Sequence, residues 1–318
     1  MGYIPDVTPS PTIGIDLGAT HFHVGLVAPD GRIVARRFEY THKEQGAQHV
    51  IERLARCVRD TCADAKAELG GAGVGRVMGG VGGVGIGAPG SIDFDRGVVI
   101  EAPNIEWRDV PLAPLLKEHL GVPITIDNDV NCAVLGENAL GSGRNAPDAL
   151  GVWVGTGVGG GIILNHRVYR GPLGTAGEIG RTVLFPDNPI GKRLMEENCS
   201  RAAVAAEIAH RNDLREPPSS ADIARAYEAN DEVVRDIVDR AADLLGISIA
   251  NTLSVMSIPL VLLGGGLAES LGEPYRARVE CALRADVFPG EPMSHVEVRL
   301  TQLRENAGLL GAAMLARS

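Results

Sequence analysis

The amino-acid sequence predicts an α/β protein with mixed sheets, arranged as two successive halves that share one order of elements. Three observations support this class. A strand meander at 12–40 opens the first half and a hairpin at 152–164 opens the second, and strands and helices follow in each half. Glycine-rich turns stand at strand ends, and glycine supplies 41 of the 318 residues, well above an average share of about 7%.

The elements of the first half follow from local patterns. Apolar residues at helical spacing predict a helix over 46–69, which Gly70 and Gly71 end. After it we expect a buried strand at 81–86, a hairpin at 93–99, a short helix at 111–119, a strand at 122–126 and a helix at 131–140.

The second half repeats this order and adds helices. Between its hairpin and the last helix, which begins near Asn306 and runs to Ala316, the region is mainly helical. The expected elements there are helices at 193–211, 219–229, 231–256 and 268–284, and strands at 258–263 and 296–300.

Two lobes are expected, because each half has its own strands and helices. They are expected to be closely joined, because no low-complexity linker separates the halves. The smaller lobe comprises 12–126 plus 306–318, and the larger lobe comprises 127–305. Residues 1–11 are polar, contain three prolines and lack the apolar core of a signal peptide, so they predict a flexible tail.

Composition and charge exclude several classes of function. The formal net charge of −10 argues against binding nucleic acid, because a phosphate backbone needs a basic surface. No apolar run is long enough to cross a membrane. The five cysteines are odd in number and form no CxxC pair, so neither a disulfide framework nor a cysteine zinc site is expected. Buried thiols in a reducing cytoplasm are the favoured interpretation.

The glycine-rich hairpin over 152–164 is the most informative chemical signal. Its turn, Gly155-Thr156-Gly157, offers bare backbone N–H groups and one hydroxyl, which suit a phosphate. A similar unit near the N-terminus has an apolar strand and the turn Gly18-Ala19-Thr20. Each turn alone is also typical of an ordinary hairpin. The two together predict a nucleotide held from two sides.

Acidic residues stand at two strand ends, where α/β sheets bind ligands. Asp129 follows Asn128 at a strand-to-helix junction, where the ordinary role of such residues is to cap the helix. Both roles are compatible if Asp127 or Asn128 caps and Asp129 accepts a proton from a hydroxyl. Asp16 lies beside the first glycine turn and is a candidate Mg²⁺ anchor through water, with turn capping as the alternative.

Other candidates carry weaker signals. Asn104 offers a donor and an acceptor, although a Pro-Asn dipeptide is commonly only a turn. Glu178 lies between glycines, and Glu196 near a helix start also suits the helix dipole. The triple glycine at 264–266 follows a buried strand and can accept the flat face of a base or ribose.

Taken together and in order, these segments resemble the ROK family of sugar kinases and related regulators, from about Ile13 to Ala316. The matching segments are 14–20 (GIDLGAT), 87–90 (GAPG), 103–104 (PN), 128–131 (NDVN), 155–161 (GTGVGGG), 177–180 (GEIG), 264–266 (GGG) and 306–312 (NAGLLGA). Each segment alone is weak evidence for the family, but all of them together in this order are specific for it.

The resemblance implies a two-lobed, actin-like (ribonuclease H-like) ATPase fold with mixed sheets flanked by helices and an interlobe cleft. It implies phosphorylation of a hexose by ATP with Mg²⁺, with Asp129 as the catalytic base. Sugar hydroxyls would be held by Asn104, Asn128, Glu178 and Glu196, with Arg181 at the sugar-site wall. Phosphates and Mg²⁺ would be held by Asp16, Gly18, Ala19, Thr20, Thr156 and Gly157. Adenosine would lie near Gly265 and Gly266. Homodimers or homotetramers are frequent in the family.

Three departures from the family pattern bear on the sugar and the nucleotide. Arg181 stands where the family usually has a zinc-binding histidine. The cysteine loop that usually follows is replaced by 185–193 (FPDNPIGKR), which contains no cysteine. No structural zinc is therefore expected, and the wall of the sugar site is expected to be rebuilt. Ala19 and His21 replace the Gly and Lys that are frequent in the first turn.

The resulting prediction is ATP-dependent phosphorylation of a small-molecule hexose, most simply glucose to glucose 6-phosphate. The alternatives are a kinase for fructose, mannose, N-acetylglucosamine or N-acetylmannosamine, and a catalytically silent sugar-sensing protein. Polyphosphate stays open as the donor. Regulators of this family carry an N-terminal DNA-binding module, and only about eleven residues precede the first strand here. We expect no nucleic-acid partner and no membrane association.

Overall fold

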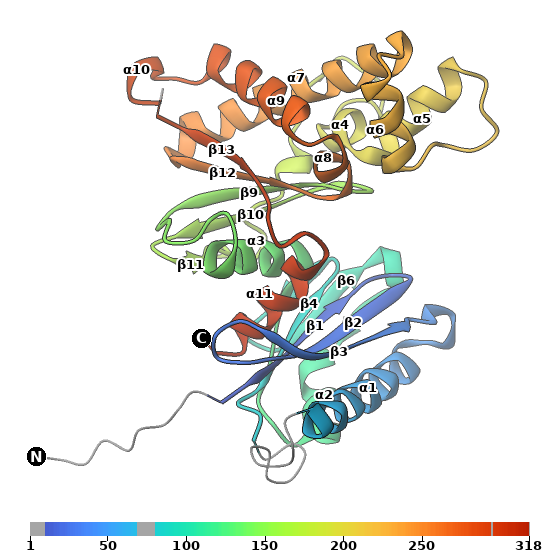
Figure 1. The fold of residues 1–318 in the computed structure, drawn as a ribbon, viewed down its shortest axis with the longest axis vertical. Coiled ribbons are helices and arrows are strands. Elements are labelled where there is room, and N and C mark those ends of the chain that lie inside the picture. Colours follow the sequence, from blue (N-terminus) through green and yellow to red (C-terminus); the bar gives the residue numbers. More distant parts are fainter. Residues whose placement is uncertain (1–9, 69–79, 294, 318) are drawn as a thin grey trace, which may run out of the picture. The chain divides into compact units, whose positions relative to one another are not determined.

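The computed structural model describes residues 10–68, 80–293 and 295–317 (Figure 1). The chain divides into two compact units. Of the described residues, unit 1 contains 10–68, 80–140, 171–175 and 305–317, and unit 2 contains 141–170, 176–293 and 295–304.

Unit 1 is built on a five-stranded sheet in the order β3-β2-β1-β4-β8. Its first three strands form an antiparallel meander, and β4 and β8 continue the sheet in parallel with β1. The strands are β1 (Thr12–Leu17), β2 (His21–Val27), β3 (Ile33–Tyr40), β4 (Val84–Ala88) and β8 (Ile124–Asn128). A smaller antiparallel sheet contains β5 (Ser91–Asp93), β6 (Val98–Ala102) and β7 (Trp107–Val110).

Helices cover the large sheet of unit 1 on both faces (Figure 1). They are α1 (Ala47–Glu68) and α2 (Leu112–Leu120) on one face, and α3 (Asp129–Leu140) and α11 (Ala307–Leu315) on the other. Alternation along β1 explains the difference between the faces, since successive side chains of a strand point to opposite sides. Ile13 and Ile15 join one apolar core with residues of α1, whereas Gly14 between them meets α11.

Glycines allow α11 to approach its neighbours at backbone distance. A Cβ on Gly85 of β4 would lie 1.8 Å from the carbonyl oxygen of Ala312, and a Cβ on Gly311 would lie 1.6 Å from that of Cys132. No real Cβ tolerates such contacts. The glycines of these motifs therefore serve helix packing as well as ligand turns.

Unit 2 repeats the sheet order of unit 1, as β11-β10-β9-β12-β13. Again three strands are antiparallel and two continue in parallel. The strands are β9 (Ala149–Val154), β10 (Val158–Leu164), β11 (Arg167–Val168), β12 (Leu260–Gly264) and β13 (Glu297–Leu300). The helices are α4 (Glu196–Cys199), α5 (Arg201–Arg211), α6 (Ser220–Glu228), α7 (Glu232–Met256), α8 (Gly266–Leu271), α9 (Glu273–Asp286) and α10 (Gly290–Met293).

The structure confirms the mixed α/β class and the repeated order of elements, but it divides two predicted helices. The helix expected over 193–211 is broken at Ser200, which has an extended backbone and whose hydroxyl caps α5 by accepting from Ala203 N. The helix expected over 268–284 divides at Gly272, which has a φ of 65°. The short strand β7 was not predicted, because only four residues form it.

The division into units also differs from the boundary predicted before Asp127. Residues 127–140 belong to unit 1, because β8 pairs with β4 and α3 packs against α11. The expected helix end at Gly70 and Gly71, and residues 1–9 of the expected tail, lie outside the described residues. Within the described chain, no helix has both the length and the apolar composition of a membrane span.

Candidate active site

The junction between β8 and α3 positions the predicted base. Asn128 caps α3, because its side-chain oxygen accepts from the backbone N–H groups of Val130 (2.9 Å) and Asn131 (3.3 Å). Asp127 supports this turn by accepting from Asn128 N and from the Asn131 side chain. The capping role therefore falls to Asn128, and Asp127 holds the turn. The Asp129 side chain accepts from Val130 N at 2.9 Å.

Two carboxyl groups of unit 1 have raised pKa values. Burial, together with the negative charge of Asp16, raises the pKa of Asp129 to about 7, against the stabilising N–H of Val130. Burial likewise raises the pKa of Asp16 to about 6. A carboxylate with a pKa close to neutral is suited to accept a proton and release it again.

Asp16 lies at the end of β1, between the first glycine turn and the start of α11. A Cβ on Gly308 would lie 2.8 Å from the Asp16 carboxylate, so a larger residue there would displace the carboxylate. The glycine turn is held by the Gly18 N–H, which donates to the carbonyl of His21 (3.0 Å), and by the Thr41 hydroxyl, which donates to the carbonyl of Gly18 (2.7 Å).

The carboxylate oxygens of Asp16 suit Mg²⁺, which keeps water and binds through one or two carboxylates plus phosphates. Among the described residues no group of three or more His, Cys, Asp or Glu can hold a metal ion. Asp16 therefore fits a magnesium ion that arrives with phosphate and water as its other ligands.

The glycine turn of unit 2 connects β9 to β10 and is closed by Gly155 N, which donates to Gly157 O at 2.9 Å. Glu196, the first residue of α4, accepts from Val158 N at 2.9 Å through Oε2. A Cβ on Gly157 would lie 2.2 Å from that oxygen, so only glycine allows the carboxylate so close. Arg181 Nη1 lies 3.5 Å from the other Glu196 oxygen. The structure thus brings together Gly157, Glu196 and Arg181.

The triple glycine of unit 2 lies beside the same hairpin. Gly264 pairs with Trp153 across β12 and β9, and Gly265 follows with a φ of 88°. A Cβ on Gly265 would lie 2.6 Å from Val154 N. The turn predicted near adenosine is therefore next to the turn predicted for phosphates.

Three predicted sugar ligands, Asn104, Glu178 and Asn128, make other local contacts or are exposed. Asn104 lies in the helical turn Pro103–Ile105 (η2); its carbonyl accepts from Lys43 Nζ at 2.8 Å, and its side chain is exposed. Glu178 is exposed just before the turn Ile179–Arg181 (η3). The amide of Asn128 donates to Gly90 O at 3.1 Å, so local bonds already use both ends of that side chain.

The segment that replaces the family's cysteine loop is closed by hydrogen bonds. The Glu197 carboxylate accepts from Arg193 N (2.7 Å) and Leu194 N (2.9 Å). Asn198 donates to Leu194 O at 2.7 Å and to Lys192 O at 3.2 Å. The segment 185–193 supplies neither thiolate nor imidazole, so its donor set does not fit zinc.

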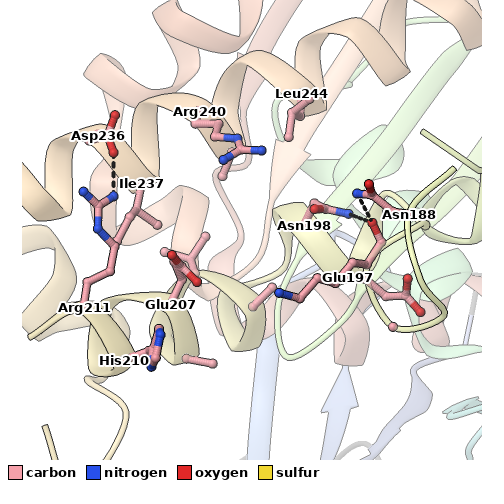
Figure 2. Close-up of a pocket in the computed structure, with 16 residues that line it drawn as sticks. Asn188, Glu197, Asn198, Glu207, His210, Arg211, Asp236, Ile237, Arg240 and Leu244 are labelled. Carbon is pink, nitrogen blue, oxygen red and sulfur yellow. Dashed lines mark hydrogen bonds and ion pairs between the residues drawn. The ribbon is translucent and has the colours of Figure 1, made fainter. Parts of the chain in front are cut away.

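A cavity of about 580 Å³ is lined by this segment and by helices α5 and α7 (Figure 2). Its lining is polar, and two of its charged residues, Arg211 and Asp236, neutralise each other at 2.6 Å. Asn188 and Asn198 both donate to Lys192 O at its other end. None of the predicted site residues lines this cavity.

Sequence reasoning missed two residues that organise unit 2. Arg201 N donates to Gly155 O at 2.9 Å, and its guanidinium donates to the Thr156 hydroxyl at 3.3 Å. Glu197 closes the loop described above. The sequence contained a signal for both residues, namely two adjacent acidic residues followed by Ser and Arg within 196–201. The prediction of one continuous helix over 193–211 concealed it.

Two sheets of identical order, with glycine turns and a carboxylate at strand ends, define the class of actin-like ATPase folds. The chain belongs to the ROK family, whose model matches residues 12–318.

Among its relatives, a glucokinase of Thermotoga maritima is 32% identical over 331 residues, covering 96% of each chain. The crystal structure of a ROK hexokinase from Thermus thermophilus matches with a TM-score of 0.78 and 31% identity, over 96% of this chain and 98% of that one. The crystal structure of a ROK family glucokinase from Streptomyces griseus, in complex with glucose and AMPPNP, matches with a TM-score of 0.79 and 30% identity. The match covers 96% of this chain and 99% of that one. A xylose repressor of Caldicellulosiruptor bescii is 26% identical over 96% of this chain and 78% of its own length.

Proposed function

We propose that this protein is an ATP-dependent sugar kinase whose substrate is a hexose, with glucose as the first candidate. The observation that carries the proposal is the Asp129 carboxylate, which directly follows the capping residue Asn128 and whose pKa burial raises to about 7. Family membership and the identity of about 30% to glucokinases support the same activity.

The proposed chemistry is a single phosphoryl transfer. The hydroxyl oxygen of the sugar bonds to the terminal phosphorus of ATP, the bond from that phosphorus to the bridging oxygen breaks, and ADP leaves with the electron pair. The hydroxyl proton passes to Asp129. Magnesium bound with ATP would neutralise phosphate charge, and Asp16 would hold it through water.

The proposed ligand contacts divide between the units. In unit 1, the turn Gly18–Thr20 with Ala19 would hold phosphate, and Asn104 and Asn128 would bind sugar hydroxyls. In unit 2, phosphate would bind Thr156 and Gly157, adenosine would lie near Gly265 and Gly266, and sugar hydroxyls would bind Glu178, Glu196 and Arg181.

The sugar is the least constrained part of the proposal, because Arg181 replaces a family histidine. Arg181 is within ion-pair distance of Glu196, so it orients a carboxylate that can accept from two hydroxyls. This charge pair supports binding of a polyhydroxy sugar in general. Fructose, mannose and the N-acetylhexosamines are therefore tested beside glucose.

The test is sugar-dependent release of ADP from Mg-ATP, measured over this panel for the wild type and for Asp129→Ala. We expect turnover with at least one hexose, reduced by about 10²–10⁴-fold in the variant. The sugar with the highest kcat/KM names the substrate. Binding of sugars by calorimetry without turnover of any of them would refute the kinase proposal and favour a sugar sensor.

A further inference from the structure

Arg201 is attached to the glycine turn of unit 2 at both its backbone and its side chain. Its N–H donates to Gly155 O at 2.9 Å, and Nη2 donates to the Thr156 hydroxyl at 3.3 Å. The first contact fixes the position of the residue, and the second directs the guanidinium toward the turn. Arg201 is the first residue of α5, which begins directly after the capping residue Ser200.

The guanidinium has donors to spare. An arginine carries five N–H donors, and one of them is used by Thr156. Among the described residues Arg201 has no carboxylate within ion-pair distance, whereas Arg211 on the same helix lies 2.6 Å from Asp236. In a protein of net charge −10, a positioned arginine without an acidic partner is a ready site for an anion.

The other side of the turn is already occupied. Glu196 fills the space beside Gly157, where a Cβ would meet its carboxylate at 2.2 Å, while a Cβ on Gly155 would meet no atom within 4 Å. The phosphate proposed to bind Gly157 would therefore approach from the side of the turn away from the Glu196 carboxylate. The open space at Gly155 lies at the end of the turn that Arg201 contacts.

The placement of Arg201 has a cost to the isolated helix. A cation in the first turn interacts unfavourably with the helix dipole, and no acidic residue of that turn of α5 offsets it. A bound anion would reverse the sign of this interaction. Helix stability alone therefore gives no reason for an arginine at this position.

We propose that Arg201 binds the terminal phosphate of the phosphoryl donor and stabilises the charge that develops there during transfer. The inference rests on the proposed kinase function and extends it: a residue of this chain, outside the glycine motifs, recognises the phosphate chain and not the nucleoside. Thr156 positions the guanidinium, and its remaining N–H groups reach the phosphate oxygens.

The test compares the wild type with Arg201→Ala and Arg201→Lys, and with Arg211→Ala as a control that removes the same charge from the far end of α5. Calorimetry measures binding of AMPPNP, inorganic tripolyphosphate and AMP, and steady-state kinetics measure kcat/KM for ATP. In Arg201→Ala we expect about 10–100-fold weaker binding of AMPPNP and tripolyphosphate and a similar loss of kcat/KM. AMP binding should stay at the wild-type value, and the melting temperature should not fall below that of the wild type.

Arg201→Lys should recover part of the loss, because lysine keeps the charge without the planar fork, and Arg211→Ala should behave as wild type. Equal losses for AMPPNP and AMP, or no loss in Arg201→Ala while the wild type turns over ATP, would overturn the inference and leave the kinase proposal intact. A wild type that binds sugar but neither AMPPNP nor tripolyphosphate would contradict both.

Discussion

Asp129 should make unit 1 less stable at neutral pH than it would be with a neutral side chain, and Asp129→Asn tests this. The pKa of Asp129 is raised from 3.8 to about 7 in the folded protein. Between these values the folded state holds a proton that the unfolded state has lost, so stability falls as pH rises through this window. Asparagine keeps the acceptor for Val130 N and removes the charge.

The size of the effect follows from the two pKa values. The destabilisation by Asp129 is about 2 kcal/mol at about pH 5.5 and about 4 kcal/mol at about pH 8, at roughly 1.4 kcal/mol per pKa unit. Asp129→Asn should therefore gain about 2 kcal/mol more over the wild type at the higher pH than at the lower one.

The assay is urea unfolding followed by tryptophan fluorescence. The chain has two tryptophans, Trp107 buried in unit 1 and Trp153 in unit 2. In a Trp153→Phe background, Trp107 reports on unit 1 alone, which avoids mixing the transitions of two units. An advantage of Asp129→Asn that is independent of pH, or that shrinks as pH rises, would refute the raised pKa.

Other predictions concern packing and the loop without cysteines. Gly311→Ala should prevent the approach of α11, since its Cβ would meet Cys132 O at 1.6 Å, and should lower the stability of unit 1 by at least about 3 kcal/mol in the Trp107 assay; a wild-type midpoint would contradict this packing. Glu197→Gln should weaken the bonds from Arg193 N and Leu194 N, speeding limited proteolysis of 185–193 with a stability loss of about 1–3 kcal/mol; unchanged cleavage would show that the loop is held otherwise. Prolonged chelation followed by return of Mg²⁺ alone should restore full activity, and a requirement for added zinc would contradict the account of this loop.

The strand ends and their acidic residues could be predicted from the sequence because local patterns specify them. Asn128-Asp129 is both a capping signal and the end of a buried strand, and the structure has Asn128 in the capping role. The repeated order of strands followed from one meander, one hairpin and the strands and helices after each. Its confirmation in both sheets shows that apolar periodicity was sufficient for the fold class.

Other features depend on contacts between distant parts of the chain. The glycines that admit α11 meet residues far away in the sequence, such as Ala312 opposite Gly85, and no local pattern distinguishes them from turn glycines. The break at Ser200 is accompanied by a long-range bond from Arg201 N to Gly155 O. The helical composition of 193–211 concealed this break, and with it the role of Arg201. The boundary between the units was misplaced for a similar reason, because α3 belongs to the unit that contains α11.

The most direct test of the central claim is the pH dependence of kcat/KM for the best hexose, measured at saturating Mg-ATP for the wild type and Asp129→Asn. With Asp129 as the base, wild-type kcat/KM should rise tenfold per pH unit at low pH and level off above about 7, the pKa that burial produces. The variant should be about 10²–10⁴-fold slower and should lack this step. A variant that retains wild-type activity with the same pH profile would contradict the assignment of Asp129.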